Sequence, residues 1–116
     1  MRVLVVDDEP DLRELYAVNL REAGHEVITA SNGAEGLGLL VRERPDVILV
    51  DLMMPVMDGY EFLQQLRKMP EHQRVPAIVI SAIATGGFSR KLGATGFVAK
   101  PFDADELVSV VERCAV

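Results

Sequence analysis

The sequence predicts an α/β domain with a parallel sheet of five strands and helices on both faces. Five short apolar runs are rich in β-branched residues and lack period-two alternation, as do strands that are buried on both faces. These runs are Val3–Val6, Val27–Ala30, Val47–Val50, Ala77–Ile80 and Phe97–Ala99. Segments with helical spacing separate the runs, and this alternation favours parallel strands joined by right-handed crossover helices.

Four of the segments between or after these runs each carry one apolar stripe, which is typical of helices that pack on a sheet. The stripes are Leu12, Leu15, Tyr16, Leu20 and Ala23; Leu37, Leu40 and Val41; Phe62, Leu63 and Leu66; and Leu107, Val110, Val111 and Cys114. Asp58 with Glu61, and Asp103 with Glu106, resemble capping boxes in which Asp replaces Ser or Thr. We therefore expect the last two of these helices to begin directly after Asp58 and Asp103.

The fourth strand–helix unit has a weak helical pattern. The stretch between Ser81 and Gly96 contains three glycines, which leaves room for little more than a turn or two of helix. We expect the fourth helix to be short or mobile.

Length and composition exclude several classes of protein. A chain of 116 residues fits one domain, residues 1–116, at roughly 100–200 residues per domain. No apolar run approaches the roughly 18 residues that span a bilayer, and a net charge of -6 makes direct binding of nucleic acid unfavourable. The single cysteine, Cys114, forms no internal disulfide or zinc site, which fits a reducing, cytoplasmic location.

Polar residues follow four of the five predicted strands. Asp7 and Asp8 come after the first strand, Asp51 after the third, Ser81 after the fourth and Lys100 after the fifth. The carboxyl ends of parallel strands meet at one edge of a sheet, where ligands bind in such folds. Two carboxylates about 4 Å apart repel by roughly 4 kcal/mol at an effective dielectric near 20, so three of them favour a bound cation. Mg²⁺, which prefers oxygen ligands, is the natural choice.

These residues also suit phosphoryl transfer. A carboxylate can act as the nucleophile and form an aspartyl-phosphate, while the metal and Lys100 neutralise the transferring oxygens and Ser81 donates a hydrogen bond to them. Taken singly, each has a plainer explanation, because such acids often cap helices, serines often lie in turns and lysines are mostly solvated. Only their joint placement at strand ends is specific.

Four short motifs follow one another along the chain. They are Asp7-Asp8, the string from Asp51 to Gly59, Ser81-Ala82 and Lys100-Pro101-Phe102. In this order, on a strand–helix alternation of this length, they resemble the CheY-like receiver domain of two-component response regulators. The resemblance covers essentially the whole chain. It implies a flavodoxin-like (βα)5 fold that accepts a phosphoryl group from a histidine kinase or phosphotransfer protein and alters its binding surface for an effector that the sequence does not identify.

The resemblance assigns roles to particular residues. Asp51 matches the phosphoacceptor. Asp7 and Asp8 match the acidic pair that holds Mg²⁺ directly or through water, together with Asp51. Met53, two positions after the acceptor, is expected to contribute its backbone carbonyl to the metal.

Other positions match the switch. Ser81 corresponds to the hydroxyl that moves toward the phosphate, and Lys100 to the lysine that pairs with the phosphoryl oxygens. Phe97 occupies the position of the aromatic residue that swings inward, without the tyrosine hydroxyl often found there. The Lys100–Pro101 bond matches the cis peptide of the family.

Two departures from the family pattern carry hypotheses. The interval from Ser81 to Lys100 is shorter than the pattern implies, so recognition through the fourth helix is expected to be altered, or this helix to order only on activation or binding. Met53 and Ile83, which flank the route of an attacking water, are both apolar, so we expect slow self-dephosphorylation.

Other functions remain as alternatives. The main one is a pseudo-receiver that binds partners without phosphorylation, although the complete residue set argues against it. A metal-dependent phosphatase usually has a second acid two residues after its nucleophile, where this chain has Met53. A flavin module is disfavoured by the acidic first loop. As a receiver, the chain catalyses only its own phosphorylation and dephosphorylation. His25 and His72 are expected to be solvated surface residues.

Overall fold

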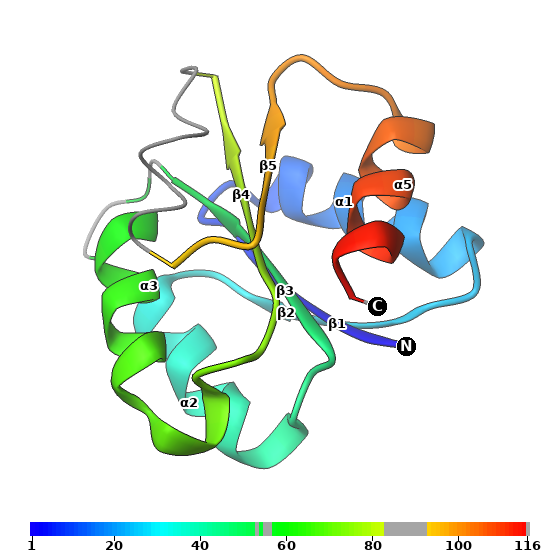
Figure 1. Cartoon of the computed structure of the whole chain (residues 1–116). Coiled ribbons are helices and arrows are strands. Elements are labelled where there is room, and N and C mark those ends of the chain that lie inside the picture. Colours follow the sequence, from blue (N-terminus) through cyan, green and yellow to red (C-terminus); the bar gives the residue numbers. More distant parts are fainter. Residues whose placement is uncertain (53, 55–56, 83–92, 116) are drawn as a thin grey trace.

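A computed structural model describes residues 1–52, 54, 57–82 and 93–115 of the chain (Figure 1). In chain order its elements are β1 (Arg2–Val6), α1 (Pro10–Glu22), β2 (Glu26–Ala30), α2 (Gly33–Glu43), β3 (Val47–Asp51), α3 (Gly59–Lys68), the short 3-10 helix η1 (Pro70–His72), β4 (Ala77–Ser81), β5 (Gly96–Ala99) and α5 (Ala104–Cys114). The strands form one sheet in the order β2-β1-β3-β4-β5, and every pair is parallel. The predicted flavodoxin-like α/β fold is confirmed. Most of the expected fourth helix, at residues 83–92, lies outside the described residues.

The sheet lies between two helical layers, with α1 and α5 on one face and α2 and α3 on the other (Figure 1). Successive side chains of a strand point to opposite faces, so Leu4 and Val6 pack toward Leu40 and Phe62, whereas Val3 packs on the other side of the sheet. Both faces are therefore apolar, which explains why the strand sequences lack period-two alternation. Among the described helices, none has the length and hydropathy that a bilayer crossing requires.

Local signals correctly placed the starts of α3 and α5. The Asp58 carboxylate accepts a hydrogen bond from the Glu61 N–H at 2.9 Å, and the Asp103 carboxylate accepts one from the Glu106 N–H at 2.8 Å. Each bond satisfies a backbone donor that the first turn of a helix leaves without a partner. The capping aspartates that the sequence predicted are thus present at both helices.

Glycine is required where α3 begins. A Cβ atom at Gly59 would lie 2.8 Å from the Leu52 Cα and 2.9 Å from the Asp51 carbonyl oxygen. The Gly59 N–H donates to the Leu52 carbonyl at 2.9 Å. This close approach brings the start of α3 against the carboxyl end of β3, so a side chain here would displace the backbone that carries Asp51.

The expectation of two solvated histidines is wrong. His72 is only 6% exposed, and η1, which carries it, contacts α3. His25 Nε2 lies 2.9 Å from Glu112 Oε2, and its side chain is 10% exposed. Both residues lie in polar turns, but the turns pack against neighbouring elements and cover the imidazole rings.

Arg67, in the last turn of α3, joins three segments at the amino end of the sheet. Its Nε and Nη2 atoms donate to the Gly93 carbonyl at 3.0 and 2.6 Å. Its Nη1 atom donates to the carbonyls of His72, Gln73 and Val75 at 3.3, 3.1 and 2.8 Å. Gly93 has φ +97°, and a Cβ there would lie 2.9 Å from Arg67 Cγ, so glycine is needed for both conformation and space.

Candidate functional site

Three carboxylates meet at the carboxyl end of the central strands. Asp7 follows β1, Asp8 follows Asp7, and Asp51 ends β3. Each offers an oxygen, and these oxygens lie within 4.8 Å of one another. Asp7 and Asp51 are 1% and 5% exposed, whereas Asp8 is half-buried. Parallel pairing of β1 with β3 creates this cluster, because both strands end at the same edge.

The Asp7 carboxyl group is buried, and its surroundings raise its pKa. Its Oδ1 atom accepts a hydrogen bond from the Glu9 N–H at 2.9 Å. Its Oδ2 atom is buried and has no hydrogen-bond partner in the described part of the chain. Burial raises the pKa of Asp7 from 3.8 to about 6; the Asp51 carboxylate adds to this rise, and the Glu9 N–H and the Lys100 charge oppose it. One carboxylate oxygen thus stays available inside the cluster.

Lys100 supplies positive charge from the end of β5. Its Nζ atom lies 3.2 Å from Asp51 Oδ2, and the two side chains are 27% and 7% exposed. The Lys100 N–H donates to the Ser81 carbonyl at 2.8 Å, so the sheet itself places the lysine beside β4. The following Lys100–Pro101 peptide bond is cis. One ammonium against three ionised carboxylates leaves an excess of negative charge.

The donor set fits a magnesium ion. Mg²⁺ prefers oxygen ligands and is held by one or two carboxylates, with water and substrate oxygens in the other positions. The buried Asp7 oxygen without a donor, beside two further carboxylates, matches this preference. Met53, whose carbonyl the family resemblance adds to the metal ligands, lies outside the described residues, as does Ile83.

Ser81 and Phe97 lie on the last two strands, and Ser81 is the one that ends its strand at the carboxyl edge. Ser81 ends β4, is 1% exposed and pairs with Ala99 of β5. Phe97 is half-buried and packs against the core between the sheet and the layer of α2 and α3. The Ser81 hydroxyl is thus at the same edge of the sheet as Asp51. The Phe97 ring lies on the side of the edge strand β5 that packs against the core below α2 and α3.

Sequence reasoning missed two residues around the cluster. Arg13 of α1 donates from Nη1 to the Asp7 carbonyl oxygen at 2.9 Å. Tyr16, one turn further on, is 3% exposed, and its pKa is raised by burial and by the nearby carboxylates of Asp7 and Asp51. Its ring lies 5.5 Å from that of Phe102. The helical apolar stripe predicted Tyr16 as a packing residue, but nothing local indicated its proximity to the acids.

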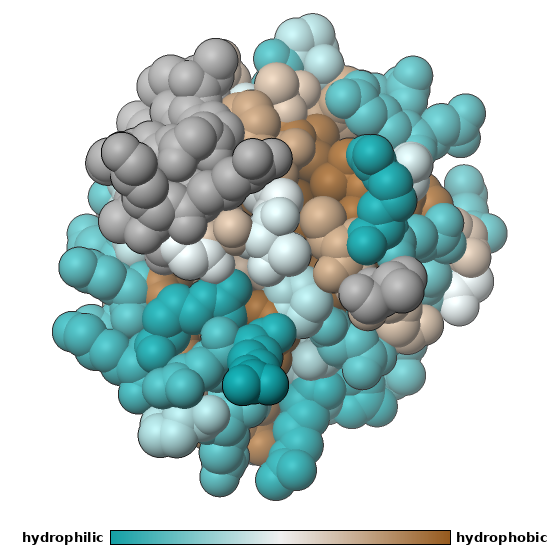
Figure 2. Space-filling model, viewed as in Figure 1, coloured by the Kyte–Doolittle hydropathy of each residue, from teal (hydrophilic) through white to brown (hydrophobic). Residues whose placement is uncertain are grey.

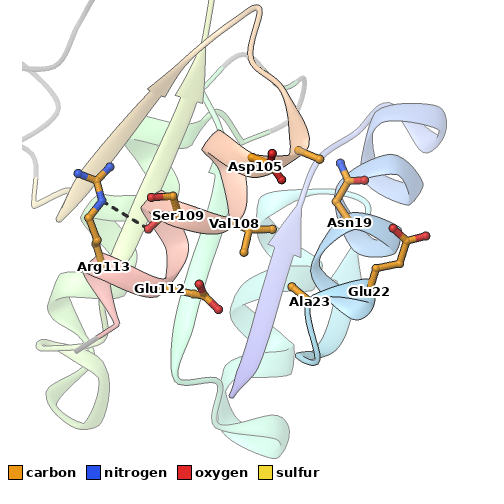
Figure 3. Close-up of a pocket in the computed structure, with 9 residues that line it drawn as sticks. Asn19, Glu22, Ala23, Asp105, Val108, Ser109, Glu112 and Arg113 are labelled. Atoms are coloured by element: carbon orange, nitrogen blue, oxygen red, sulfur yellow. Dashed lines mark hydrogen bonds between the residues drawn. The ribbon is translucent and has the colours of Figure 1, made fainter.

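Two surface grooves lie on the α1 and α5 side of the molecule. One, of about 570 Å³, runs between α1 and α5 and is lined by polar side chains that include Glu22, Asp105 and Glu112 (Figure 3). The other, of about 440 Å³, is more apolar and is lined by Leu12, Leu15, Tyr16, Asn19, Lys100, Pro101, Phe102, Asp103 and Ala104. Of these two grooves, the second reaches two residues beside the carboxylate cluster, Tyr16 and Lys100.

Comparison with known proteins gives concordant results. The chain is 35% identical over 115 residues to the DNA-binding dual master transcriptional regulator RpaA of Synechocystis, covering 95% of this chain and 47% of RpaA. It is 38% identical over 116 residues to a 14.6 kDa protein of Leptolyngbya boryana, covering 97% of this chain and 88% of that protein. Apart from this short protein, the chain spans about half the length or less of the curated relatives compared here.

Solved structures agree with the fold. The chemotaxis protein CheY4 of Vibrio cholerae superposes with a TM-score of 0.92 at 34% identity, with 97% of each chain covered. The receiver domain of NtrX from Brucella abortus superposes with a TM-score of 0.90 at 35% identity, again with 97% of each covered. The model of the response regulator receiver domain matches residues 3–112. This chain therefore belongs to the response regulator receiver domain family.

Proposed function

We propose that this chain is the phosphoacceptor switch of a two-component system, in which Asp51 accepts a phosphoryl group in a Mg²⁺-dependent reaction. The observation that carries the proposal is the position of Asp51. Its buried carboxylate lies 3.2 Å from the Lys100 ammonium and beside the carboxylates of Asp7 and Asp8. This arrangement combines a nucleophile, a fixed cation and metal ligands within one small site. Residues 1–116 would then act as one receiver domain.

In the proposed reaction, an Asp51 oxygen forms a bond to phosphorus while the bond to the donor's imidazole nitrogen breaks and its electrons return to the ring. Bound Mg²⁺, held by Asp7, Asp8 and Asp51, would neutralise the charge on the phosphoryl oxygens. Lys100, whose Nζ atom lies 3.2 Å from Asp51 Oδ2, would pair with a phosphoryl oxygen after transfer. Release of the phosphoryl group to water completes the cycle, so the chain catalyses only its own modification.

Ser81 and Phe97 are the proposed switch residues. The Ser81 hydroxyl stands at the end of β4, next to the strand that carries Asp51. A hydrogen bond from this hydroxyl to the phosphoryl group would shift β4, and Phe97 of the neighbouring strand would repack in response. Because Phe97 has no hydroxyl, packing alone would set its two positions.

The proposed phosphodonor is a histidine kinase or a phosphotransfer protein, which must dock beside the site to reach Asp51. The apolar groove of about 440 Å³ suits this role, because it extends from Lys100 along Leu12 and Leu15 of α1. Leu15 is 52% exposed, so it offers apolar surface at this groove.

The downstream partner is an effector protein or domain. Figure 2 shows apolar surface between β5 and α5 on a face that is otherwise mostly hydrophilic. RpaA is named as a DNA-binding transcriptional regulator, and this chain covers 47% of its length. With a net charge of -6, this segment is not itself expected to bind nucleic acid, and a cytoplasmic location fits its role.

Intact-mass spectrometry after incubation with acetyl phosphate and Mg²⁺ tests the proposal. The wild type is expected to gain one phosphoryl group, and Asp51→Ala none. Asp11→Ala is the matched control, because Asp11 is an exposed acid in the first turn of α1. No gain in the wild type, under conditions in which a known receiver is modified, would favour a pseudo-receiver. A gain that survives Asp51→Ala would place the acceptor elsewhere.

A further inference from the structure

Arg13 reaches back from the first turn of α1 to the end of β1. Its Nη1 atom donates to the Asp7 carbonyl oxygen at 2.9 Å, in a partly buried position. We infer that Arg13 is a positioning residue for the magnesium site, because it fixes the backbone that carries Asp7 and Asp8. This inference rests on the proposed function, in which those two carboxylates hold the metal.

Asp7 is held at three points. Its N–H donates to the Ala30 carbonyl at 3.1 Å, its Oδ1 accepts from the Glu9 N–H at 2.9 Å, and its carbonyl accepts from Arg13. The atom left over is Oδ2, which is buried and has no hydrogen-bond partner among the residues described. A ligand oxygen fixed in this way needs little rearrangement when a cation binds.

Asp8 depends on Arg13 more directly. The Asp7 carbonyl and the Asp8 N–H belong to one planar peptide unit, so a bond that fixes the first also limits rotation of the second. The Asp8 carboxylate makes no hydrogen bond to another described residue, and its direction is therefore set mainly by its backbone. Loss of the Arg13 bond would free the peptide unit that aims Asp8 at the cluster.

Arg13 acts through the carbonyl rather than as a counter-ion. It forms no ion pair within the described ranges, whereas Lys100 pairs with Asp51. The pKa of Asp7 is shifted by its burial and by Glu9, Asp51 and Lys100. The relevant change is therefore removal of the hydrogen-bond donor, rather than of the charge alone. Loss of a group that holds metal ligands in position typically weakens metal affinity by about 10-fold to 100-fold.

The test measures Mg²⁺ affinity of the full chain by isothermal titration calorimetry. Arg13→Met removes every donor but keeps the apolar stem, and it is expected to weaken the Kd for Mg²⁺ by about 10-fold. Arg13→Lys keeps one donor and is expected to fall between Arg13→Met and the wild type. Arg21→Met is the matched control, since Arg21 lies on the same helix and also donates to a carbonyl, that of Val27 at 3.3 Å; its Kd should stay within about 2-fold of the wild type.

A second readout separates positioning from general damage. The rate of phosphorylation by acetyl phosphate is measured against Mg²⁺ concentration, and the rate of Arg13→Met is expected to recover at saturating Mg²⁺. Equal Kd values for Arg13→Met and Arg21→Met would overturn the inference, as would an Arg13→Lys affinity no better than that of Arg13→Met. The inference would also be overturned if excess Mg²⁺ did not restore the phosphorylation rate of Arg13→Met.

The inference and the proposed function fail in distinguishable ways. If the wild type binds Mg²⁺ but takes up no phosphoryl group, the proposed function is wrong, and the affinities of the Arg13 variants still decide the positioning role. If the wild type is phosphorylated and Arg13→Met binds Mg²⁺ normally, only the inference about Arg13 is wrong.

Discussion

At the carboxyl end of the sheet, a buried carboxylate oxygen of Asp7 has no hydrogen-bond partner in the described chain, whereas at the amino end the half-buried Arg67 guanidinium donates to four carbonyls. The first arrangement places like charges together, and Asp7 lies beside Asp51 and Asp8. The second surrounds one charge with matched acceptors. The same fold thus treats charged side chains in opposite ways at its two ends.

The difference separates binding from stability. An unpaired buried polar group costs about 1–3 kcal/mol, and more when it is charged, so the carboxyl end lowers the stability of the free protein. That cost is recovered when a cation or a phosphoryl group arrives. At the amino end Arg67 donates to the surrounding carbonyls within the chain, although the buried Nε2 atom of His72 has no hydrogen-bond partner among the described residues.

The largest expected effect is the loss of the Arg67 contacts. Arg67→Met leaves the carbonyls of Gly93, His72, Gln73 and Val75 without this donor, and we expect a loss of about 3–4 kcal/mol in the free energy of unfolding. Urea denaturation followed by circular dichroism measures it. Lys68→Met, at the exposed neighbouring position, is the control and should change stability by less than about 0.5 kcal/mol. Similar losses in both variants would show that the Arg67 contacts contribute no more to the free energy of unfolding than an exposed lysine does.

The next effect is a pH dependence at the carboxyl end, measured without metal. Because the pKa of Asp7 is raised from 3.8 to about 6 in the folded chain, the folded state binds this proton more tightly than the unfolded state. Its contribution to stability is complete below pH 3.8 and is lost as pH rises through about 6. Asp7→Asn, which stays neutral, should therefore be more stable than the wild type by roughly 3 kcal/mol at pH 7, and the difference should vanish near pH 3.5.

Urea denaturation of both proteins in chelator-containing buffer, from pH 3.5 to 7.5, checks this dependence. Asp11→Asn controls for the loss of an exposed acid, and its difference from the wild type should change little with pH. A wild type that gains stability relative to Asp7→Asn as pH rises would mean that the Asp7 carboxylate is stabilised by a partner.

Sequence patterns predicted the features that depend on short-range signals or on topology alone. Apolar runs placed all five strands, and the aspartate caps placed the starts of α3 and α5. The meeting of Asp7, Asp51 and Lys100 followed from parallel strands whose carboxyl ends share an edge. These inferences needed no knowledge of side-chain packing.

Features that depend on distant partners escaped prediction. Arg67 looks like an ordinary cation in the last turn of a helix, yet its Gly93 acceptor lies 26 positions away. The prediction for His72 was wrong for the same reason, because its burial depends on how η1 packs against other elements, α3 among them. The different environments of the adjacent Asp7 and Asp8 likewise depend on the geometry of one turn, which includes the contact with Arg13.

A smaller effect is the stabilisation by the metal itself. Mg²⁺ at ten times its Kd should raise the free energy of unfolding by about 1.4 kcal/mol, because only the folded chain assembles the three carboxylates. Asp8→Asn should reduce this gain at the same Mg²⁺ concentration, while Asp11→Asn should retain it. Thermal unfolding with and without Mg²⁺ gives the comparison. A gain that Asp8→Asn leaves intact would remove Asp8 from the metal site.

The smallest effect concerns Asp58, an acid near the carboxyl edge that the structure uses as a helix cap. Its carboxylate accepts from the Glu61 N–H at 2.9 Å, so Asp58→Ala should lower stability by about 1 kcal/mol and leave the Kd for Mg²⁺ unchanged. Asp103→Ala, which removes the equivalent cap of α5, should behave in the same way. Urea denaturation and calorimetry together separate capping from ligation. If Asp58→Ala weakened Mg²⁺ binding without loss of stability, Asp58 would belong with the carboxylates of the metal site, and the contrast between charges satisfied within the chain and charges that await a ligand would have to be drawn within the carboxyl edge itself.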